Sequence, residues 1–231
     1  MVGRMRPIQR REALGMLATG AFGRRLVADS LLRPARDAVD HIVIGAADLE
    51  RGIATLERRI GVRPAIGGSH PGRGTRNALF SLGGRQYAEL IAPDPAQAGT
   101  TDAYGLSGFG EPRMLMWAAS TMNIEALAAR LKAVPNAGSR VRPDGRTLRW
   151  RTVSVAEPGL VPFFIQWDEQ SLHPSEDSPH GCTLAALAFE DPDPAAATRT
   201  LAEVGIAAHV DRGAVPRIKA TLETPRGSVA L

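Results

Sequence analysis

The feature of this 231-residue chain that most constrains its fold is a recurring pattern of one strand, one amphipathic helix and further strands. In the first copy, the side chain of Asp48 can accept hydrogen bonds from the free N–H groups of a helix start, and Gly61 can end the helix. In the last copy, Asp193 and Gly205 stand at almost the same spacing. Such internal repetition indicates a chain assembled from similar units.

The first copy is marked most clearly. Its helix, expected over residues 48–60, carries one apolar stripe at helical spacing, made of Leu49, Ile53, Leu56 and Ile60. A glycine-rich loop is expected at 67–74, and the strands are expected at 41–45, 62–66, 77–82 and 86–92. The order is β-α-β-β-β, and we expect the helix to pack on the outer face of a curved sheet.

Two further copies follow. The second is expected to have a strand at 114–119, a helix at 123–133, and strands at 147–155 and 161–167. The third is expected to have a strand at 183–189, a helix after Asp193-Pro194, and strands near 206–210, 217–223 and 228–231. Units this small cannot bury both faces of a sheet, so we expect them to pair edge to edge around a concave cavity.

The predicted fold class is therefore α+β, with repeated β-α-β-β-β units that form a curved mixed sheet with helices outside. The predicted domains are a basic extension at 1–36, a pair of units at 38–168, and a third unit at 183–231. A linker rich in proline, serine and acidic residues joins the last two at 168–179.

The extension accounts for the net positive charge of the chain. Residues 1–36 contain eight arginines and two acidic residues, whereas the remainder has 20 basic and 22 acidic residues. Arg10-Arg11 precedes a short, weakly apolar stretch, which is typical of a twin-arginine export signal. A disordered or amphipathic tail, or a start codon chosen too far upstream, would give the same pattern. The localisation that we expect is cytoplasmic, and export by a twin-arginine signal is the alternative.

Charge and composition exclude several classes of function. The folded part has no basic stripe, so we expect no nucleic-acid partner. No run of 18 apolar residues occurs, so no membrane-spanning helix is expected. Cys182 is the single cysteine, which rules out a disulfide within the chain. The remaining partners are a small-molecule substrate and, in a homodimer, a second copy of the chain.

Two of the expected buried strands carry a polar group where an apolar one is usual. These are His41 in Asp40-His41-Ile42-Val43-Ile44, and Glu89 in Gln86-Tyr87-Ala88-Glu89-Leu90-Ile91. Burying either group without a partner costs at least several kcal/mol. Because side chains alternate along a strand, both groups can face one concave surface. A divalent metal ion would satisfy both, and zinc, iron, manganese and nickel accept imidazole and carboxylate.

The motifs around these residues resemble the glyoxalase-like branch of the vicinal oxygen chelate superfamily. The resemblance covers residues 38–95 best and rests on Val39-Asp40-His41-Ile42-Val43-Ile44, Asp48-Leu49-Glu50, His70-Pro71-Gly72 with Gly74-Thr75, and Tyr87-Ala88-Glu89-Leu90-Ile91. It implies paired β-α-β-β-β units and a divalent metal that chelates two adjacent substrate oxygens. Isomerases, epimerases, ring-cleaving dioxygenases and binding proteins without catalytic activity belong to this superfamily.

The resemblance also implies roles for individual residues. His41 and Glu89 would be the metal ligands of the first unit, and Gln166 would stand at the position equivalent to Glu89 in the second unit. The first strand of the second unit has no His or Glu in Arg113-Met114-Leu115-Met116-Trp117, so the second unit departs from the pattern.

Further candidates come from their positions in the chain. His70 in the glycine-rich loop is a candidate proton donor or substrate contact at the cavity mouth, and its alternative is an exposed turn histidine. Asn77 and Gln166 are candidate substrate contacts, and Trp167 is a candidate apolar wall. His173 in the linker could be a third metal ligand, or it could be exposed to solvent.

These observations favour a small-molecule enzyme of lyase, isomerase or dioxygenase type, in which Glu89 is the general base and His70 the proton donor. The alternative is a protein of the same fold that binds or sequesters a small molecule without metal. An enzyme with a metal requires a third protein ligand, and the sequence identifies only two.

Overall fold

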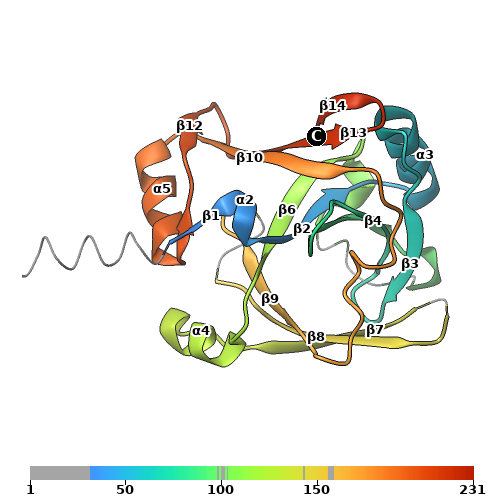
Figure 1. Cartoon of the computed structure of the whole chain (residues 1–231), viewed down its shortest axis with the longest axis horizontal. Coiled ribbons are helices and arrows are strands. Elements are labelled where there is room, and N and C mark those ends of the chain that lie inside the picture. Colours follow the sequence, from blue (N-terminus) through green and yellow to red (C-terminus); the bar gives the residue numbers. More distant parts are fainter. Residues whose placement is uncertain (1–31, 98, 100–101, 103, 143, 156–158) are drawn as a thin grey trace, which may run out of the picture. The chain divides into compact units, whose positions relative to one another are not determined.

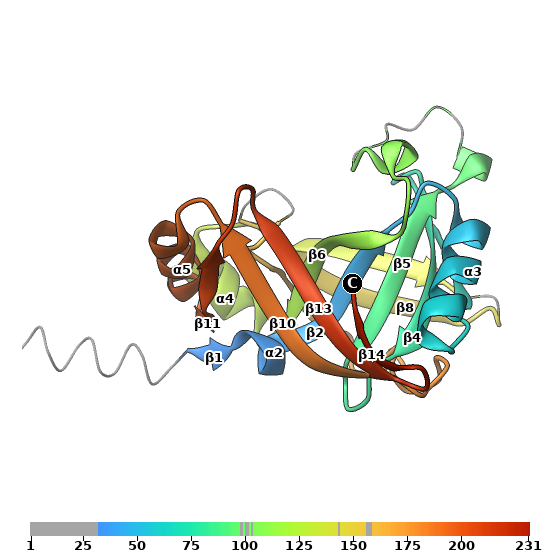
Figure 2. The same ribbon diagram turned by 90° about the horizontal axis from the view of Figure 1, so that it is seen from above.

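The computed structural model describes residues 32–231 except 98, 100, 101, 103, 143 and 156–158. The chain divides into two units, Met1–Leu32 and Arg33–Leu231. Figures 1 and 2 show the second unit. The predicted export signal and most of the predicted extension lie outside the described residues.

Two β-α-β-β-β units build one eight-stranded sheet. The first consists of β2 (Val39–Gly45), α3 (Leu49–Ile60), β3 (Ala65–His70), β4 (Thr75–Ser81) and β5 (Tyr87–Pro93). The second consists of β6 (Arg113–Ser120), α4 (Ile124–Leu131), β7 (Asn136–Val141), β8 (Thr147–Val153) and β9 (Phe163–Trp167). The strand order is β3-β4-β5-β2-β6-β9-β8-β7, and the antiparallel pair β2–β6 joins the units. The predicted curved mixed sheet of repeated units is confirmed.

The sheet curls until its two edge strands, β3 and β7, approach each other (Figure 1). A Cβ atom added to Gly68 of β3 would lie 2.9 Å from the carbonyl oxygen of Val141 in β7, which shows how close the edges are. The sheet is therefore nearly a barrel, with an inner face that encloses a cavity and an outer face that packs against other elements.

Helix α3 covers part of the outer face, as its apolar stripe predicts. Asp48 accepts a hydrogen bond from the backbone N–H of Arg51 at 2.8 Å, and Gly61 ends the helix with a left-handed φ of 76°. All four side chains of the stripe are buried, and they share one core with Ile42 and Ile44 of β2. His41 and Val43, which alternate with these residues along β2, are thereby left to face the cavity.

The C-terminal segment forms a separate four-stranded sheet over the same outer face (Figure 2). Its elements are β10 (Thr183–Asp191), α5 (Pro194–Glu203), β11 (Ile206–Ala207), β12 (Val210–Arg212), β13 (Arg217–Thr224) and β14 (Gly227–Ala230). The strand order β12-β10-β13-β14 differs from that of the first unit, where the first strand β2 pairs with the last strand β5. The assignment of this segment as a third unit stays a prediction.

The first described residues are integrated into this fold. β1 (Arg33–Pro34) pairs with β11, and α2 (Ala35–Ala38) leads into β2. Arg33 donates hydrogen bonds to the carbonyl of Ser120, and Arg36 donates to that of Leu184. Residues 33–36, which the sequence assigns to the extension, therefore belong to the folded part.

Two strands differ from expectation. β3 begins later than predicted and runs to His70, so this histidine ends a strand, where it pairs with Thr75, and does not lie in a loop. β7 was not predicted, because Asn136-Ala137-Gly138-Ser139-Arg140-Val141 has few apolar residues and no clear alternation.

Short helices η1 (Pro95–Gln97) and η2 (Leu106–Gly108) connect β5 to β6. None of the described helices is long and apolar enough to cross a bilayer.

The burial of α3 yields a prediction for stability. The side chain of Leu56 is fully buried. We expect Leu56→Ala to lower the free energy of unfolding by about 2 to 5 kcal/mol, because it removes apolar contacts and leaves a cavity. Arg51→Ala, at an exposed position of the same helix, should change it by less than about 0.5 kcal/mol. Urea denaturation measures both, and equal losses would contradict the packing.

Candidate functional site

The inner face of the sheet encloses a cavity of about 610 Å³, which is within the range of small-molecule sites. The first unit contributes polar groups to its wall, among them His41, His70, Asn77 and Glu89. The second unit contributes mainly aromatic and apolar side chains.

Strand pairing explains why His41 and Glu89 meet. β2 and β5 are parallel neighbours, with His41 beside Tyr87 and Val43 beside Glu89. Alternation then places His41, Tyr87 and Glu89 on one face, and all three line the cavity. Nε2 of His41 lies 3.7 Å from Oε2 of Glu89. The predicted approach of these two side chains within one cavity is therefore present.

A β-bulge brings Asp40 to the same place. Val39 pairs with Ala119 and His41 pairs with Ala118, so Asp40 is an extra residue in β2. A bulge re-aims the side chain of the extra residue. The carboxylate of Asp40, 2% exposed, consequently lies beside its neighbour, with Oδ1 2.8 Å from Nδ1 of His41.

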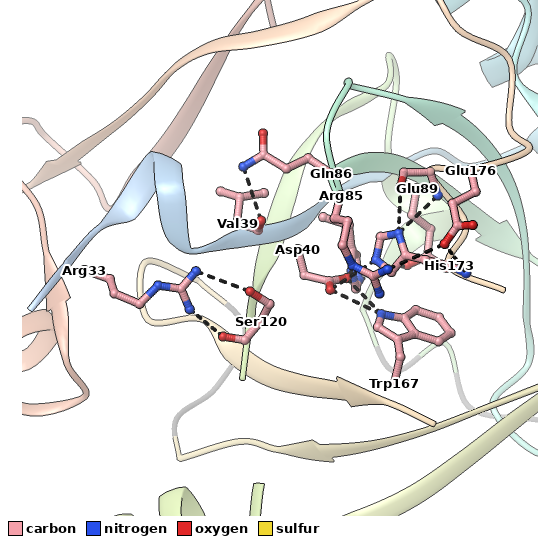
Figure 3. Close-up of polar contacts among 12 residues, drawn as sticks. Arg33, Val39, Asp40, Arg85, Gln86, Glu89, Ser120, Trp167, His173 and Glu176 are labelled. Atoms are coloured by element: carbon pink, nitrogen blue, oxygen red, sulfur yellow. Dashed lines mark hydrogen bonds and ion pairs between the residues drawn. The ribbon is translucent and has the colours of Figure 1, made fainter. Parts of the chain in front are cut away.

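Asp40 also binds groups that are far away in the chain (Figure 3). Its Oδ2 lies 3.3 Å from Nε2 of His173, and Nε1 of Trp167 donates to the carboxylate at 3.2 Å. His173 is fully buried, and its Nδ1 lies 2.8 Å from the hydroxyl of Ser175. The linker histidine is thus neither exposed nor a ligand candidate beside Glu89, but a second partner of Asp40.

The state of Asp40 determines which nitrogen of His41 is protonated. Burial by itself raises the pKa of Asp40, but hydrogen bonds and charges from His173 and His41 outweigh it and lower the pKa to about 2. The ionised carboxylate only accepts hydrogen bonds, so Nδ1 of His41 carries the proton. In the neutral ring, Nε2 then presents a lone pair toward Glu89 and the cavity.

Glu89 is held as an anion by polar neighbours. Nδ2 of Asn77 donates to Oε1 at 2.6 Å, and Nε2 of His70 lies 3.4 Å from the same oxygen. Burial raises the pKa of Glu89, whereas His70, His41 and Asn77 together lower it to about 2. Nδ1 of His70 lies 2.8 Å from the hydroxyl of Thr75, which orients this ring.

Aromatic rings form the remaining wall. His41 stacks on Tyr87 with ring centroids 4.5 Å apart, and Phe163 contacts His41 edge-on at 5.4 Å. The ring centroids of Trp167 and Trp150, which also line the cavity, lie 5.3 Å apart. Burial raises the pKa of Tyr87 well above 10.0, and the charges of Asp40 and Glu89 act in the same direction, so the phenol stays neutral.

The fit of a metal ion can be judged from these donors. The hydrogen bond to Asp40 leaves Nε2 of His41 available as a ligand, a common arrangement at metal sites. However, the described part of the chain contains no group of three or more His, Cys, Asp or Glu side chains that could hold a metal ion. One oxygen of Glu89 already accepts from Asn77. These residues do not complete the three-ligand set of a catalytic centre.

The predicted site residues separate into two groups. His41, His70, Asn77, Glu89 and Trp167 all line the cavity. Gln166 does not line it, because alternation along β9 turns Ile165 and Trp167 inward and Gln166 outward. Its Oε1 accepts a hydrogen bond from the backbone N–H of Ile124 at the start of α4. Matching Gln166 with Glu89 in the sequence is therefore wrong by one residue, because the inward-facing residues of β9 are the neighbours of Gln166.

Three residues of the site were missed as functional candidates. The sequence identifies Asp40 only as part of a motif and Tyr87 only as part of a strand, and it gives neither residue a role. Arg140 lines the cavity from β7, the strand that was not predicted. The repeat could have identified the strand that carries Arg140, because a β-α-β-β-β unit requires a strand between α4 and β8.

Comparison with known families agrees with this architecture. The family model described as glyoxalase-like domain matches residues 39–205, which is more than half of the chain. The chain belongs to the glyoxalase-like domain family. This confirms the resemblance that was based on residues 38–95. No match was found among curated proteins.

Solved structures similar to this glyoxalase-like protein include methylmalonyl-CoA epimerases. The Mycobacterium tuberculosis enzyme is 18% identical, with a TM-score of 0.40, and the match covers 61% of this chain and 93% of that one. A Streptomyces coelicolor variant, in complex with 2-nitronate-propionyl-CoA, is 17% identical, with a TM-score of 0.41 and coverages of 58% and 97%. Identities and scores this low carry no functional argument.

The two depressed carboxyl pKa values predict how stability depends on pH. Both are lower in the folded chain than their ordinary values of 3.8 and 4.5, so the unfolded chain binds more protons between about pH 5 and pH 2. We expect the free energy of unfolding to fall as the pH is lowered through this window, by about 2 to 3 kcal/mol for each group.

Urea denaturation at a series of pH values measures this effect. Asp40→Asn and Glu89→Gln should each flatten the dependence, whereas Glu203→Gln at an exposed position of α5 should leave it unchanged. Identical curves for all three variants and the wild-type protein would contradict the expectation.

Proposed function

We propose that the protein is a small-molecule enzyme of the isomerase or lyase type, which transfers a proton of a carbonyl compound bound in the cavity. The observation that carries this proposal is the buried Asp40–His41 pair, in which Nε2 of His41 faces the cavity beside Glu89. A histidine that a carboxylate holds in one tautomer is suited to accept a proton from a bound substrate.

Two features favour His41 over Glu89 as the base. A carboxylate with a pKa of about 2 is a weak base at neutral pH, so Glu89 is better suited to stabilise positive charge on the two imidazoles. His41 has an anionic partner at each nitrogen, Asp40 at 2.8 Å and Glu89 at 3.7 Å. Both stabilise the imidazolium that forms when His41 accepts a proton.

The proposed step is a proton transfer next to a carbonyl group. The C–H bond of the substrate breaks, its proton goes to Nε2 of His41, and the electron pair forms the C=C bond of an enol. His70, in its protonated form, donates a proton to the carbonyl oxygen. To complete an isomerisation, the enol hydroxyl returns its proton to His70, the C=O bond re-forms, and His41 delivers its proton to another face or another carbon. To complete an elimination, the enol hydroxyl returns its proton to His70, a group on the carbon next to the enol C=C bond leaves with its bonding electron pair, and His41 gives its proton to this leaving group.

The wall of the cavity supports this chemistry. Val43, Ile91, Leu106 and Met116 form a small apolar cluster inside the sheet, and Phe163 packs against it. Such a wall excludes water, which strengthens the electrostatic effect of Asp40 and Glu89 on the reacting group.

A divalent ion bound by His41 and Glu89 remains the alternative form of this proposal, and dioxygenation is the reaction type that would depend on it. The ion enters no step above, because the described donors do not complete its ligand set. A binding protein without activity is the second alternative, and the aromatic wall favours it.

Hydrogen exchange tests the proposed reaction. We expect the protein to incorporate deuterium from D₂O into at least one compound of a panel of 2-oxo acids, hydroxyketones and thioesters, as followed by NMR. His41→Gln should lower the exchange rate by about 10² to 10⁴. His209→Gln, whose side chain is 86% exposed, is the matched control and should leave the rate unchanged.

The same panel separates the alternatives. Compounds that bind but show no exchange with the wild-type protein would contradict the enzyme and favour the binding protein. Exchange that survives in His41→Gln would show that the base is another group.

Metal dependence is tested in two ways: elemental analysis of protein purified without chelator measures bound metal, and the exchange rate is measured before and after treatment with EDTA. We expect exchange to persist after treatment with EDTA, because the proposed groups transfer the proton without metal. Loss of exchange, with recovery on addition of Zn²⁺, Fe²⁺, Mn²⁺ or Ni²⁺, would contradict this. Loss of bound metal in both His41→Ala and Glu89→Ala would then establish these residues as ligands.

A further inference from the structure

Arg140 is a buried cation that the proposed reaction does not use. It lies on β7, and its residue is 4% exposed. Its side chain lines the cavity from the second unit, which among the described lining residues contributes no imidazole and no carboxylate. Burial lowers the pKa of Arg140, with Glu89 and Tyr87 acting in the opposite direction, and a guanidinium remains charged in either case.

The guanidinium of Arg140 has few partners. Among the described residues its side chain makes one hydrogen bond, from Nη1 to Oδ1 of Asn77 at 3.5 Å. No carboxylate of the described residues forms an ion pair with it. A guanidinium has five N–H donors, and a buried charge without a partner is unfavourable. Most of these donors are therefore free to bind a group inside the cavity.

The neighbouring strand is shaped around this side chain. A Cβ atom added to Gly67 of β3 would lie 2.6 Å from Nη1 of Arg140 and would overlap Oδ1 of Asn77. Glycine at this position thus allows Arg140 to extend from β7 across the gap between the edge strands. The contact with Oδ1 also places Nδ2 of Asn77 against Glu89, so Arg140 and Glu89 lie on opposite sides of one amide.

A second cation lies at the rim of the cavity. Arg73, in the turn between β3 and β4, is exposed and lines the cavity, and no side-chain partner is seen for it among the described residues. Apart from the two histidines, the charged lining residues are Arg73 and Arg140 against Glu89. The cavity thus has an excess of positive charge, which attracts an anion.

We infer that the cavity binds a small organic carboxylate, whose carboxylate group is held by Arg140. This inference rests on the proposed function and names its substrate class: an anionic carbonyl compound whose carboxylate lies at Arg140 and whose reacting carbon faces His41. The planar guanidinium fork matches the two oxygens of a carboxylate. The rings of Phe163, Trp150 and Trp167 provide an apolar surface for the rest of the molecule.

A carboxylate fits better than a phosphate. The cavity offers one buried guanidinium, and the anionic Glu89 lies just beyond Asn77. The second negative charge of a phosphate dianion would find no second buried guanidinium. Glu89 would also repel a dianion more strongly than a monoanion.

The test compares two ligands that differ in the carboxylate. Phenylpyruvate and phenylacetone share a phenyl ring and a ketone, but phenylacetone has a methyl group in place of the carboxylate. We expect the wild-type full chain to bind phenylpyruvate more tightly, as measured by calorimetry. Arg140→Met should raise the Kd of phenylpyruvate by about tenfold to a hundredfold and hardly affect phenylacetone, because hydrogen bonds to a charged group are lost.

Controls distinguish recognition from a structural role. Arg140→Lys keeps the charge without the fork, so its Kd should lie between those of the wild type and Arg140→Met, and it gives the same information if the Met variant does not fold. Arg199→Met, at an exposed position of α5, removes one positive charge elsewhere and should change neither Kd. Melting temperatures verify that each variant is folded.

Three outcomes would overturn the inference: equal binding of the two ligands by the wild type, an equal loss for both in Arg140→Met, or competition by inorganic phosphate as strong as by phenylpyruvate. Binding is measured without turnover, so the inference and the proposed reaction fail separately. Carboxylate binding through Arg140 without any hydrogen exchange would support the inferred binding site and contradict the proposed reaction. Exchange of uncharged ketones that is independent of Arg140 would support the reaction and contradict the inferred binding site.

Discussion

The buried carboxylate of Asp40 is the interaction on which the rest of the site depends. It accepts hydrogen bonds from the neighbouring His41, from Trp167 of the last strand of the sheet, and from His173 of the linker, 133 residues away. One anion therefore connects both units of the sheet and the segment that follows them. Without these donors a carboxylate at this depth would be strongly unfavourable, and with them it determines the tautomer of His41.

The two units of this glyoxalase-like protein differ in what they contribute to the cavity. The first provides a hydrogen-bonded set of imidazoles and a carboxylate, centred on Glu89. The second provides aromatic rings and one guanidinium, Arg140. This asymmetry gives a substrate two different environments, with a polar group that can transfer a proton on one side and an apolar surface with a cation on the other. In a cavity that is partly shielded from water, both act more strongly than they would in bulk water.

Much of the first unit could be predicted because its signals are local. The stripe and caps of α3, and the alternation along β2 and β5, depend on residues a few positions apart, and they place His41 and Glu89 on one face. Local signals were weaker in the second unit. There β7 lacks an apolar pattern, and the alignment of Gln166 with Glu89 was off by one residue, which is enough to turn a side chain to the other face of a strand.

The sequence by itself determined the repeated units, the curved sheet with its outer helix, and the inward direction of His41 and Glu89, because periodicity and capping act over short distances. Only the tertiary structure decided the groups that surround them. A bulge turned Asp40 toward His41, the path of the linker brought His173 to Asp40, and the curl of the sheet brought Arg140 across to Asn77. Each of these contacts joins strands or segments whose relative position follows from how the whole sheet closes, and no local pattern encodes that closure.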